Sequence, residues 1–140
     1  MVAMPLNPSR NDDPRKLRDL LQRVANLASE HRLTSVVVGM SGLESDMLFP
    51  EVVDFVGSAL RVDDSIFRMT RSRAIFFLAD ADEMQASEIM ERVLSGFHER
   101  FATTQKTLVS LTYFEVTPEA KDVSVKQVLP LLFAPPADSH

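Results

Sequence analysis

The sequence predicts an α+β domain with a ferredoxin-like core, a mainly antiparallel sheet with helices on one face. Two observations lead to this fold class. Helical and strand patterns follow one another in the order αβαββαβα, which contains two strand–helix–strand units. Two runs rich in β-branched and aromatic residues, Ser65–Met69 and Ala74–Ala79, flank a short polar link, Thr70–Arg73, and predict a β-hairpin. The link lacks the Asn-Gly or Asp-Gly pair of primed turns, which leaves its turn type open.

Composition restricts the classes of function that the chain can have. A length of 140 residues with 45% hydrophobic and 25% charged residues is typical of one globular domain with one core. The net charge of -5 argues against a nucleic-acid polymer as partner. Cysteine is absent, which excludes disulfides and thiolate metal sites. No apolar run reaches the roughly 18–20 residues of a membrane span, so we expect a cytoplasmic domain without membrane insertion.

The chain begins with a predicted irregular leader, residues 1–12, and ends with an irregular tail, residues 134–140, around a domain at 13–133. The first helix is predicted over Pro14–His31, because Asp13 is a good N-cap and proline suits the first helical position. Its apolar residues recur at helical spacing: Leu17, Leu20, Leu21, Val24, Leu27 and Ala28.

A buried strand and a short helix are predicted next. Three consecutive valines in Leu33–Met40 predict a strand that is buried on both faces of the sheet. A turn at Gly42–Asp46 leads to a helix over Phe49–Leu60, with Pro50 in its first turn. Gly57 inside this helix suggests close packing against a strand.

The second half of the chain predicts a long helix, a strand and a short helix. The long helix follows the hairpin, with Asp80 or Asp82 as its cap. Its apolar stripe is Met84, Ala86, Ile89, Met90, Val93, Leu94, Phe97 and Phe101, in which the methionines are core fillers or, alternatively, an exposed surface for a partner. His98 is expected on the surface. A strand over Thr107–Val116 and a helix over Ser124–Phe133, capped by Ser124 and disturbed by Pro130, complete the order.

The segment Arg61–Ala79 resembles the central hairpin of a GGDEF (diguanylate cyclase) domain. That family has Arg-x-x-Asp, five residues, and then Gly-Gly-Asp/Glu-Glu-Phe before an apolar strand. Here Arg61-Val-Asp-Asp64 fills the first element, Ser65–Met69 is the spacer, and Thr70–Ala74 takes the place of the signature. The spacing matches and the signature residues differ. The resemblance therefore implies a nucleotide-cyclase-like core in a degenerate, non-catalytic domain.

The resemblance also predicts that the chain has no cyclase activity. Cyclases of the family hold metal ions with carboxylates from the end of the first strand and from the hairpin turn. The matching positions carry Gly39 or Ser41 in the strand, and Ser72 and Arg73 in the turn. Two-metal phosphoryl transfer needs carboxylates to hold the ions, whereas Arg71 and Arg73 bring positive charge. We expect no catalytic residue, no metal site and no cofactor.

Two kinds of binding remain. In active relatives Arg-x-x-Asp is an inhibitory site for cyclic di-GMP, which implies a receptor site at Arg61 and Asp64, with Arg68 near the same surface. Alternatively, Asp64 braces the hairpin and Arg61 is its solvated partner. Arg71 and Arg73, together with Arg68, predict a basic patch for an acidic protein partner or a phosphate, unless they are simply solvated. We expect a protein-interaction module of bacterial cyclic di-GMP-related regulation, with a cyclic di-GMP receptor as the alternative.

Overall fold

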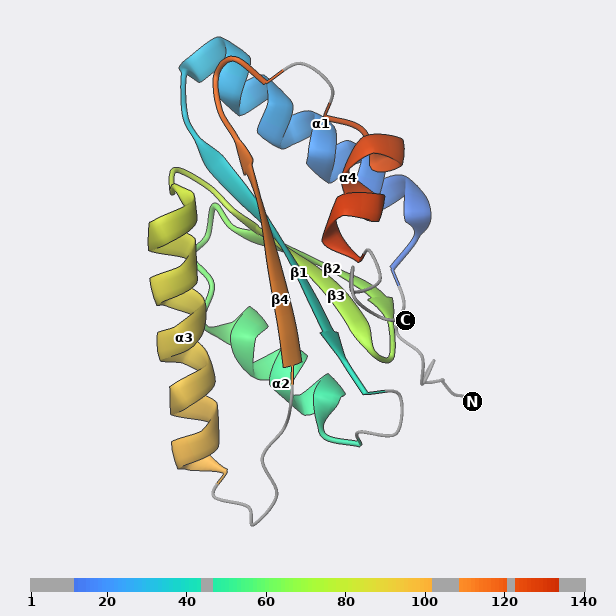
Figure 1. Cartoon of the computed structure of the whole chain (residues 1–140), viewed down its shortest axis with the longest axis vertical. Coiled ribbons are helices and arrows are strands. Elements are labelled where there is room, and N and C mark those ends of the chain that lie inside the picture. Colours follow the sequence, from blue (N-terminus) through green and yellow to red (C-terminus); the bar gives the residue numbers. More distant parts are fainter. Residues whose placement is uncertain (1–11, 44–46, 102–108, 121–122, 134–140) are drawn as a thin grey trace, which may run out of the picture.

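A computed structural model describes residues 12–43, 47–101, 109–120 and 123–133, and its elements follow the predicted order (Figure 1). The helices and strands are α1 (Pro14–His31), β1 (Ser35–Gly42), α2 (Phe49–Ser58), β2 (Ser65–Thr70), β3 (Arg73–Leu78), α3 (Glu83–Arg100), β4 (Val109–Val116) and α4 (Val125–Leu132). The predictions for residues 1–11 and 134–140, and for most of the turn before α2, lie outside the described residues. No described helix combines the length and apolar character needed to cross a membrane.

The four strands form one sheet in the order β2-β3-β1-β4, in which all neighbours are antiparallel. This is the strand order of a ferredoxin-like core built from two strand–helix–strand units, so the predicted fold class is confirmed. Strand β1 lies inside the sheet, with β3 on one side and β4 on the other. Val36, Val37 and Val38 are all fully buried, which confirms that β1 is covered on both faces.

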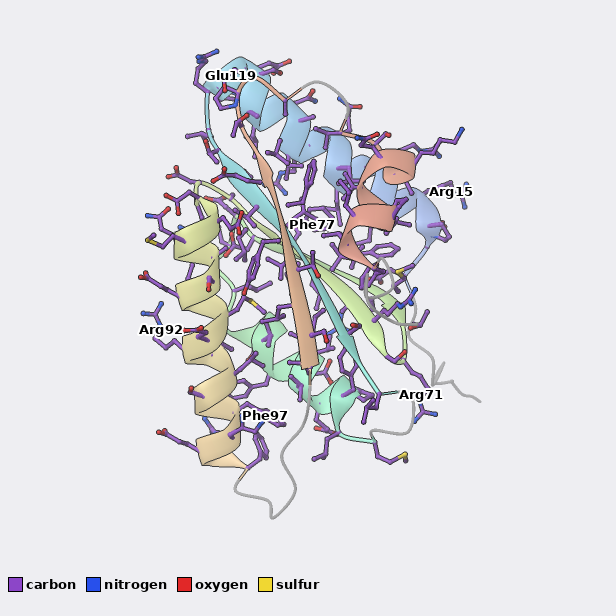
Figure 2. All side chains as sticks on the ribbon, viewed as in Figure 1. Arg15, Arg71, Phe77, Arg92, Phe97 and Glu119 are labelled. Atoms are coloured by element: carbon purple, nitrogen blue, oxygen red, sulfur yellow. The ribbon has the colours of Figure 1, made fainter. Side chains whose placement is uncertain are left out.

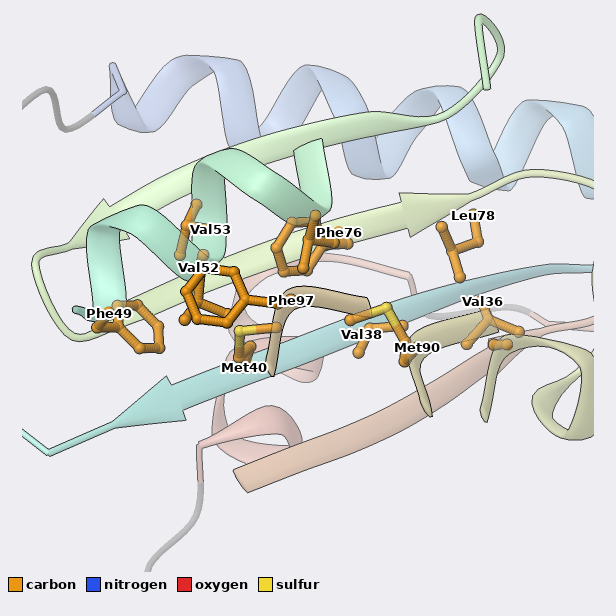
Figure 3. Close-up of a cluster of buried hydrophobic side chains, with 13 residues drawn as sticks. Val36, Val38, Met40, Phe49, Val52, Val53, Phe76, Leu78, Met90 and Phe97 are labelled. Atoms are coloured by element: carbon orange, nitrogen blue, oxygen red, sulfur yellow. The ribbon is translucent and has the colours of Figure 1, made fainter. Parts of the chain in front are cut away.

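Helices cover both faces of the sheet, whereas the sequence predicted one (Figure 1). The helices of the two strand–helix–strand units, α2 and α3, pack on one face against alternate β1 residues that include Val38 and Met40. Figure 3 shows this cluster, which contains Phe49 of α2 and Phe97 of α3 together with residues of the strands. The opposite face, which includes Val37, is covered by α1 and α4. Like α2 and α3, the helices α1 and α4 have apolar stripes. These stripes are buried because α1 and α4 pack on the second face of the sheet.

Local sequence explains where the helices begin. Asp13 accepts a hydrogen bond from the backbone N–H of Arg15 at 2.9 Å, which confirms it as the cap of α1. Of the two candidate caps of α3, the structure selects Asp82, which forms a reciprocal capping box with Gln85. Ser124 caps α4 as predicted.

Three packing predictions need correction. Met84, predicted in the apolar stripe of α3, is 72% exposed, whereas Met90 is buried. Gly57 is not a close-contact position, because a Cβ there would meet Ile66 at an ordinary 3.6 Å. His98 is half-buried instead of lying on the surface, and its ring packs edge-on against Phe97.

Candidate functional site

An open groove lies at the end of the sheet where strand β1 stops and the β2–β3 hairpin turns. Its volume is about 670 Å³, and its lining residues are Ser41 and Gly42 of β1 with Thr70, Arg71, Ser72 and Arg73 of the hairpin. The pairing of β1 with β3 places Ser41 opposite Arg73. Residues about thirty positions apart in sequence therefore share one site, as the resemblance to a cyclase hairpin implies.

The hairpin turn is short and tied to β1. Its two central residues, Arg71 and Ser72, both have negative φ, which rules out a type I′ or II′ turn. A register shift leaves Met69 as an extra residue in β2, and such a bulge supplies local twist. The N–H of Ser72 donates to Thr70 Oγ1 at 3.1 Å, and the carbonyl oxygen of Ser72 accepts from the N–H of Gly42 at 2.9 Å.

The two strand positions proposed for a metal-holding carboxylate have different surroundings. A Cβ on Gly39 would lie 2.8 Å from Cβ of Leu132, so α4 occupies the space that a side chain would need. Ser41 lines the groove and carries only a hydroxyl. None of the described lining residues is acidic, and the described part of the chain contains no cluster of three or more His, Cys, Asp or Glu suited to a metal ion.

Arg71 and Arg73 bring positive charge to the groove. Arg71 is exposed at the turn (Figure 2), and its Nη2 lies 3.5 Å from the thioether sulfur of Met47. The guanidinium of Arg73 lies over the ring of Phe133, 5.0 Å from its centroid. Neither arginine forms an ion pair with a carboxylate of the described residues.

Arg68 does not join these two arginines as a free charge. Its Nη2 lies 2.8 Å from Oδ1 of Asp54 in α2, which neutralises it locally. Its backbone N–H donates to Asp12 Oδ2 at 2.7 Å, and its carbonyl oxygen accepts from the N–H of Asp12 at 2.8 Å. Asp12 thus pairs with the edge strand β2, a role that the sequence analysis missed because it assigned this residue to the leader.

Asp64 and Arg61 form a compact bracket at the other end of β2. The carboxylate of Asp64, only 4% exposed, accepts from the backbone N–H of Ala79 at 2.9 Å and from the backbone N–H of Arg61 at 3.1 Å. It also accepts from Nε and Nη2 of Arg61, each at 3.3 Å, while the same Nη2 donates to the carbonyl oxygen of Ala79. The bonded carboxylate raises the pKa of Arg61 above its usual value.

The structure therefore separates the three residues that the resemblance placed in one ligand site. Arg61 and Asp64 lie where β2 begins, and Arg68 lies near the hairpin turn. Arg68 lies four positions after Asp64 in extended chain, a span of about 13 Å. The side chain of Arg61 is 56% exposed and remains accessible, whereas the carboxylate of Asp64 is enclosed by internal donors.

Comparisons with known proteins bear on the fold. No protein-family model matches the chain, and no curated protein is similar to it in sequence. Among solved structures, the GGDEF domain of FimX from Pseudomonas aeruginosa is similar with a TM-score of 0.64 at 12% identity, over 87% of this chain and 88% of that one. A DGC protein from Thermotoga maritima gives a TM-score of 0.64 at 18% identity, over 88% and 93% of the two chains.

A third similar structure is PelD 156–455 from Pseudomonas aeruginosa PA14, solved in complex with c-di-GMP. Its TM-score is 0.65 at 18% identity, over 86% of this chain and 44% of the PelD chain, so this chain spans less than half of PelD. Together these similarities show that the chain has the fold of a GGDEF domain, which confirms the fold implied by the hairpin. At these identities the likeness concerns the fold alone.

Proposed function

We propose that this chain is a catalytically inactive GGDEF-like domain that acts by binding a protein partner in bacterial cyclic di-GMP-related regulation. The observation that carries the proposal is the lining of the groove. The positions that would supply metal-holding carboxylates carry Gly39 or the hydroxyl of Ser41 in the strand, and the hydroxyl of the buried Ser72 and the guanidinium of Arg73 in the turn, while Arg71 adds a second guanidinium to the groove.

Electrostatics oppose metal-dependent phosphoryl transfer in this groove. Transfer between nucleotides needs divalent ions that neutralise the charge developing on the phosphates. A guanidinium about 5 Å from a divalent ion repels it by about 1–2 kcal/mol even at the dielectric constant of bulk water, and more beside a protein surface. A groove with two such groups, and no carboxylate among its described lining residues, disfavours the ions that the reaction requires.

A cyclase assay tests this part of the proposal. The purified chain is incubated with GTP and Mg²⁺ or Mn²⁺, and cyclic di-GMP is measured by chromatography. We expect no product above the level of a sample without protein. Steady turnover would refute the proposed inactivity, whatever the chain binds.

A second candidate is a cyclic di-GMP receptor that binds through Arg61 and Asp64. It is favoured by the similarity in fold to PelD in complex with c-di-GMP and by the exposed guanidinium of Arg61. Against it stand the four N–H donors that already contact the carboxylate of Asp64, because a guanine would have to displace them.

Calorimetric titration with cyclic di-GMP separates the two candidates. The matched pair of variants is Arg61→Ala and Arg15→Ala, since Arg15 is also an exposed arginine paired with a nearby aspartate. Micromolar binding that is lost with Arg61→Ala and kept with Arg15→Ala would establish the receptor. We expect no binding in either the unmodified chain or the variants, which leaves the protein-interaction function.

A further inference from the structure

We propose that the groove at the hairpin turn binds an acidic peptide segment of a protein partner, whose carboxylates pair with Arg71 and Arg73 while an apolar side chain packs on Met47. This inference rests on the proposed function, because it names the chemistry of the partner at the same groove. It is argued from the charge of the groove, the state of its backbone amides, and the apolar side chains beside it.

The first argument is charge complementarity. Arg15, Arg61 and Arg68 each contact an aspartate within 3.3 Å, whereas several other described arginines form no ion pair. Arg71 and Arg73 belong to the second group and are distinguished by lining the same groove, in a chain that is acidic as a whole. A guanidinium presents a planar fork of donors that matches a carboxylate in a bidentate pair. Two neighbouring forks without carboxylates therefore suit an acidic ligand.

The second argument concerns the backbone amides, and it favours a carboxylate over a nucleotide phosphate. Phosphate sites use free N–H groups of a loop or a helix N-terminus. In this groove the N–H of Ser72 donates to Thr70, and the N–H of Gly42 donates to the carbonyl oxygen of Ser72. Both amides are satisfied internally. Neither of these two amides is free for a phosphate, and the two positive charges of Arg71 and Arg73 fall short of the charge of a nucleoside triphosphate without metal ions.

The third argument is the apolar surface next to the charges. Met47 is 75% exposed, and its sulfur contacts the guanidinium of Arg71. Leu43, which directly follows the lining residue Gly42, is 57% exposed. A flexible thioether adapts to apolar side chains of different shapes. Charged and apolar groups side by side fit a peptide that carries both acidic and apolar side chains.

The stacking of Arg73 favours binding further. Its guanidinium lies over Phe133, which holds the side chain in place before a ligand arrives. Binding then costs less side-chain entropy than it would with a freely rotating arginine. The groove volume of about 670 Å³ also lies within the range of about 300–1,000 Å³ that is common for ligand sites.

The test uses fluorescence anisotropy with a labelled peptide in which aspartate alternates with leucine, and the full chain as receptor. Control probes are the peptide with asparagine in place of aspartate, GTP without metal ions, and vesicles containing phosphatidylserine. The variants are Arg71→Gln, Arg73→Gln and their combination. The matched control is Arg92→Gln, which makes the same charge change on the exposed side of α3, on a different side of the molecule from Arg71 (Figure 2).

We expect saturable binding of the aspartate peptide, weakened about tenfold by each groove substitution and unchanged by Arg92→Gln. The asparagine peptide should bind at least tenfold more weakly. Three results would overturn the inference: no saturable binding of the aspartate peptide, equal loss with Arg92→Gln, or tighter binding of GTP or vesicles than of the peptide. If the chain fails these tests and still makes no cyclic di-GMP, the inference of peptide binding is refuted while the proposed inactivity stands.

Discussion

The bracket at the start of β2 gives a direct test of whether Asp64 has a structural role. Replacing Asp64 by alanine removes the acceptor for two backbone N–H groups, those of Arg61 and Ala79, and for the side chain of Arg61. Ala79 is buried, so its N–H would lose a partner without gaining water, at a cost of about 1–3 kcal/mol. Losing the hydrogen bond to the backbone N–H of Arg61 adds about 1 kcal/mol to this cost, and losing the exposed ion pair with the side chain of Arg61 adds less.

The expected loss from Asp64→Ala is therefore about 3 kcal/mol of unfolding free energy, a large part of the 5–15 kcal/mol typical of a domain. Arg61→Ala should cost about 1 kcal/mol, because the carboxylate keeps its backbone donors. Asp63→Ala is the matched control, since Asp63 is an exposed neighbouring aspartate for which we expect a change within about 0.5 kcal/mol.

Urea denaturation followed by circular dichroism measures all three variants. A value for Asp64→Ala that equals the Asp63→Ala control would refute the bracket as a source of stability. If such a stable variant also lost binding of cyclic di-GMP, the carboxylate would belong to ligand recognition instead. We expect the unfolding free energy to be lowest for Asp64→Ala, higher for Arg61→Ala, and nearest to that of the unmodified chain for Asp63→Ala.

Three further predictions follow from single sites. Gly39→Ala should lower the unfolding free energy by about 1–3 kcal/mol because its Cβ would clash with Leu132, whereas Gly57→Ala, which has room, should leave thermal stability equal or slightly higher. Asp82→Ala should cost about 1 kcal/mol in denaturant titration, since it removes the capping box of α3. Tyr113, the single tyrosine, has its pKa raised, first by burial and then by nearby glutamates, so its phenolate absorbance should appear above pH 10. Its contribution to stability is present below pH 10 and declines as pH rises through the folded pKa.

Sequence patterns located most elements because their causes are local. The boundaries of α1 were predicted to the residue, since an aspartate–proline pair starts the helix and the apolar period follows it. The consecutive valines of β1 identified the inner strand, because only a strand covered on both faces buries adjacent side chains.

Contacts between distant segments could not be predicted in the same way. Asp12 pairs with Arg68 across more than fifty residues, and Arg73 stacks on Phe133 across sixty. The sequence shows that α1 and α4 have apolar stripes, yet it does not show which face of the sheet they cover. At the candidate site, the hairpin was predicted from its residue pattern, and the residues of its turn were singled out by the resemblance to a GGDEF hairpin. The apolar side chain of Met47 was missed because nothing in its local pattern marks it as exposed.

The end of α4 packs both on β1, a strand without a carboxylate, and against Arg73 of the groove. Leu132 fills the space above Gly39, and the next residue, Phe133, carries the guanidinium of Arg73 on its ring. Introducing aspartate at Gly39 would push Leu132 away and thereby disturb the ring beneath Arg73. A carboxylate at position 39 and a stacked Arg73 are therefore difficult to combine in this fold. If position 39 is the one that matches the metal-holding carboxylate of a cyclase, the proposed inactivity and the proposed peptide recognition share one structural cause, the close packing of α4 on β1.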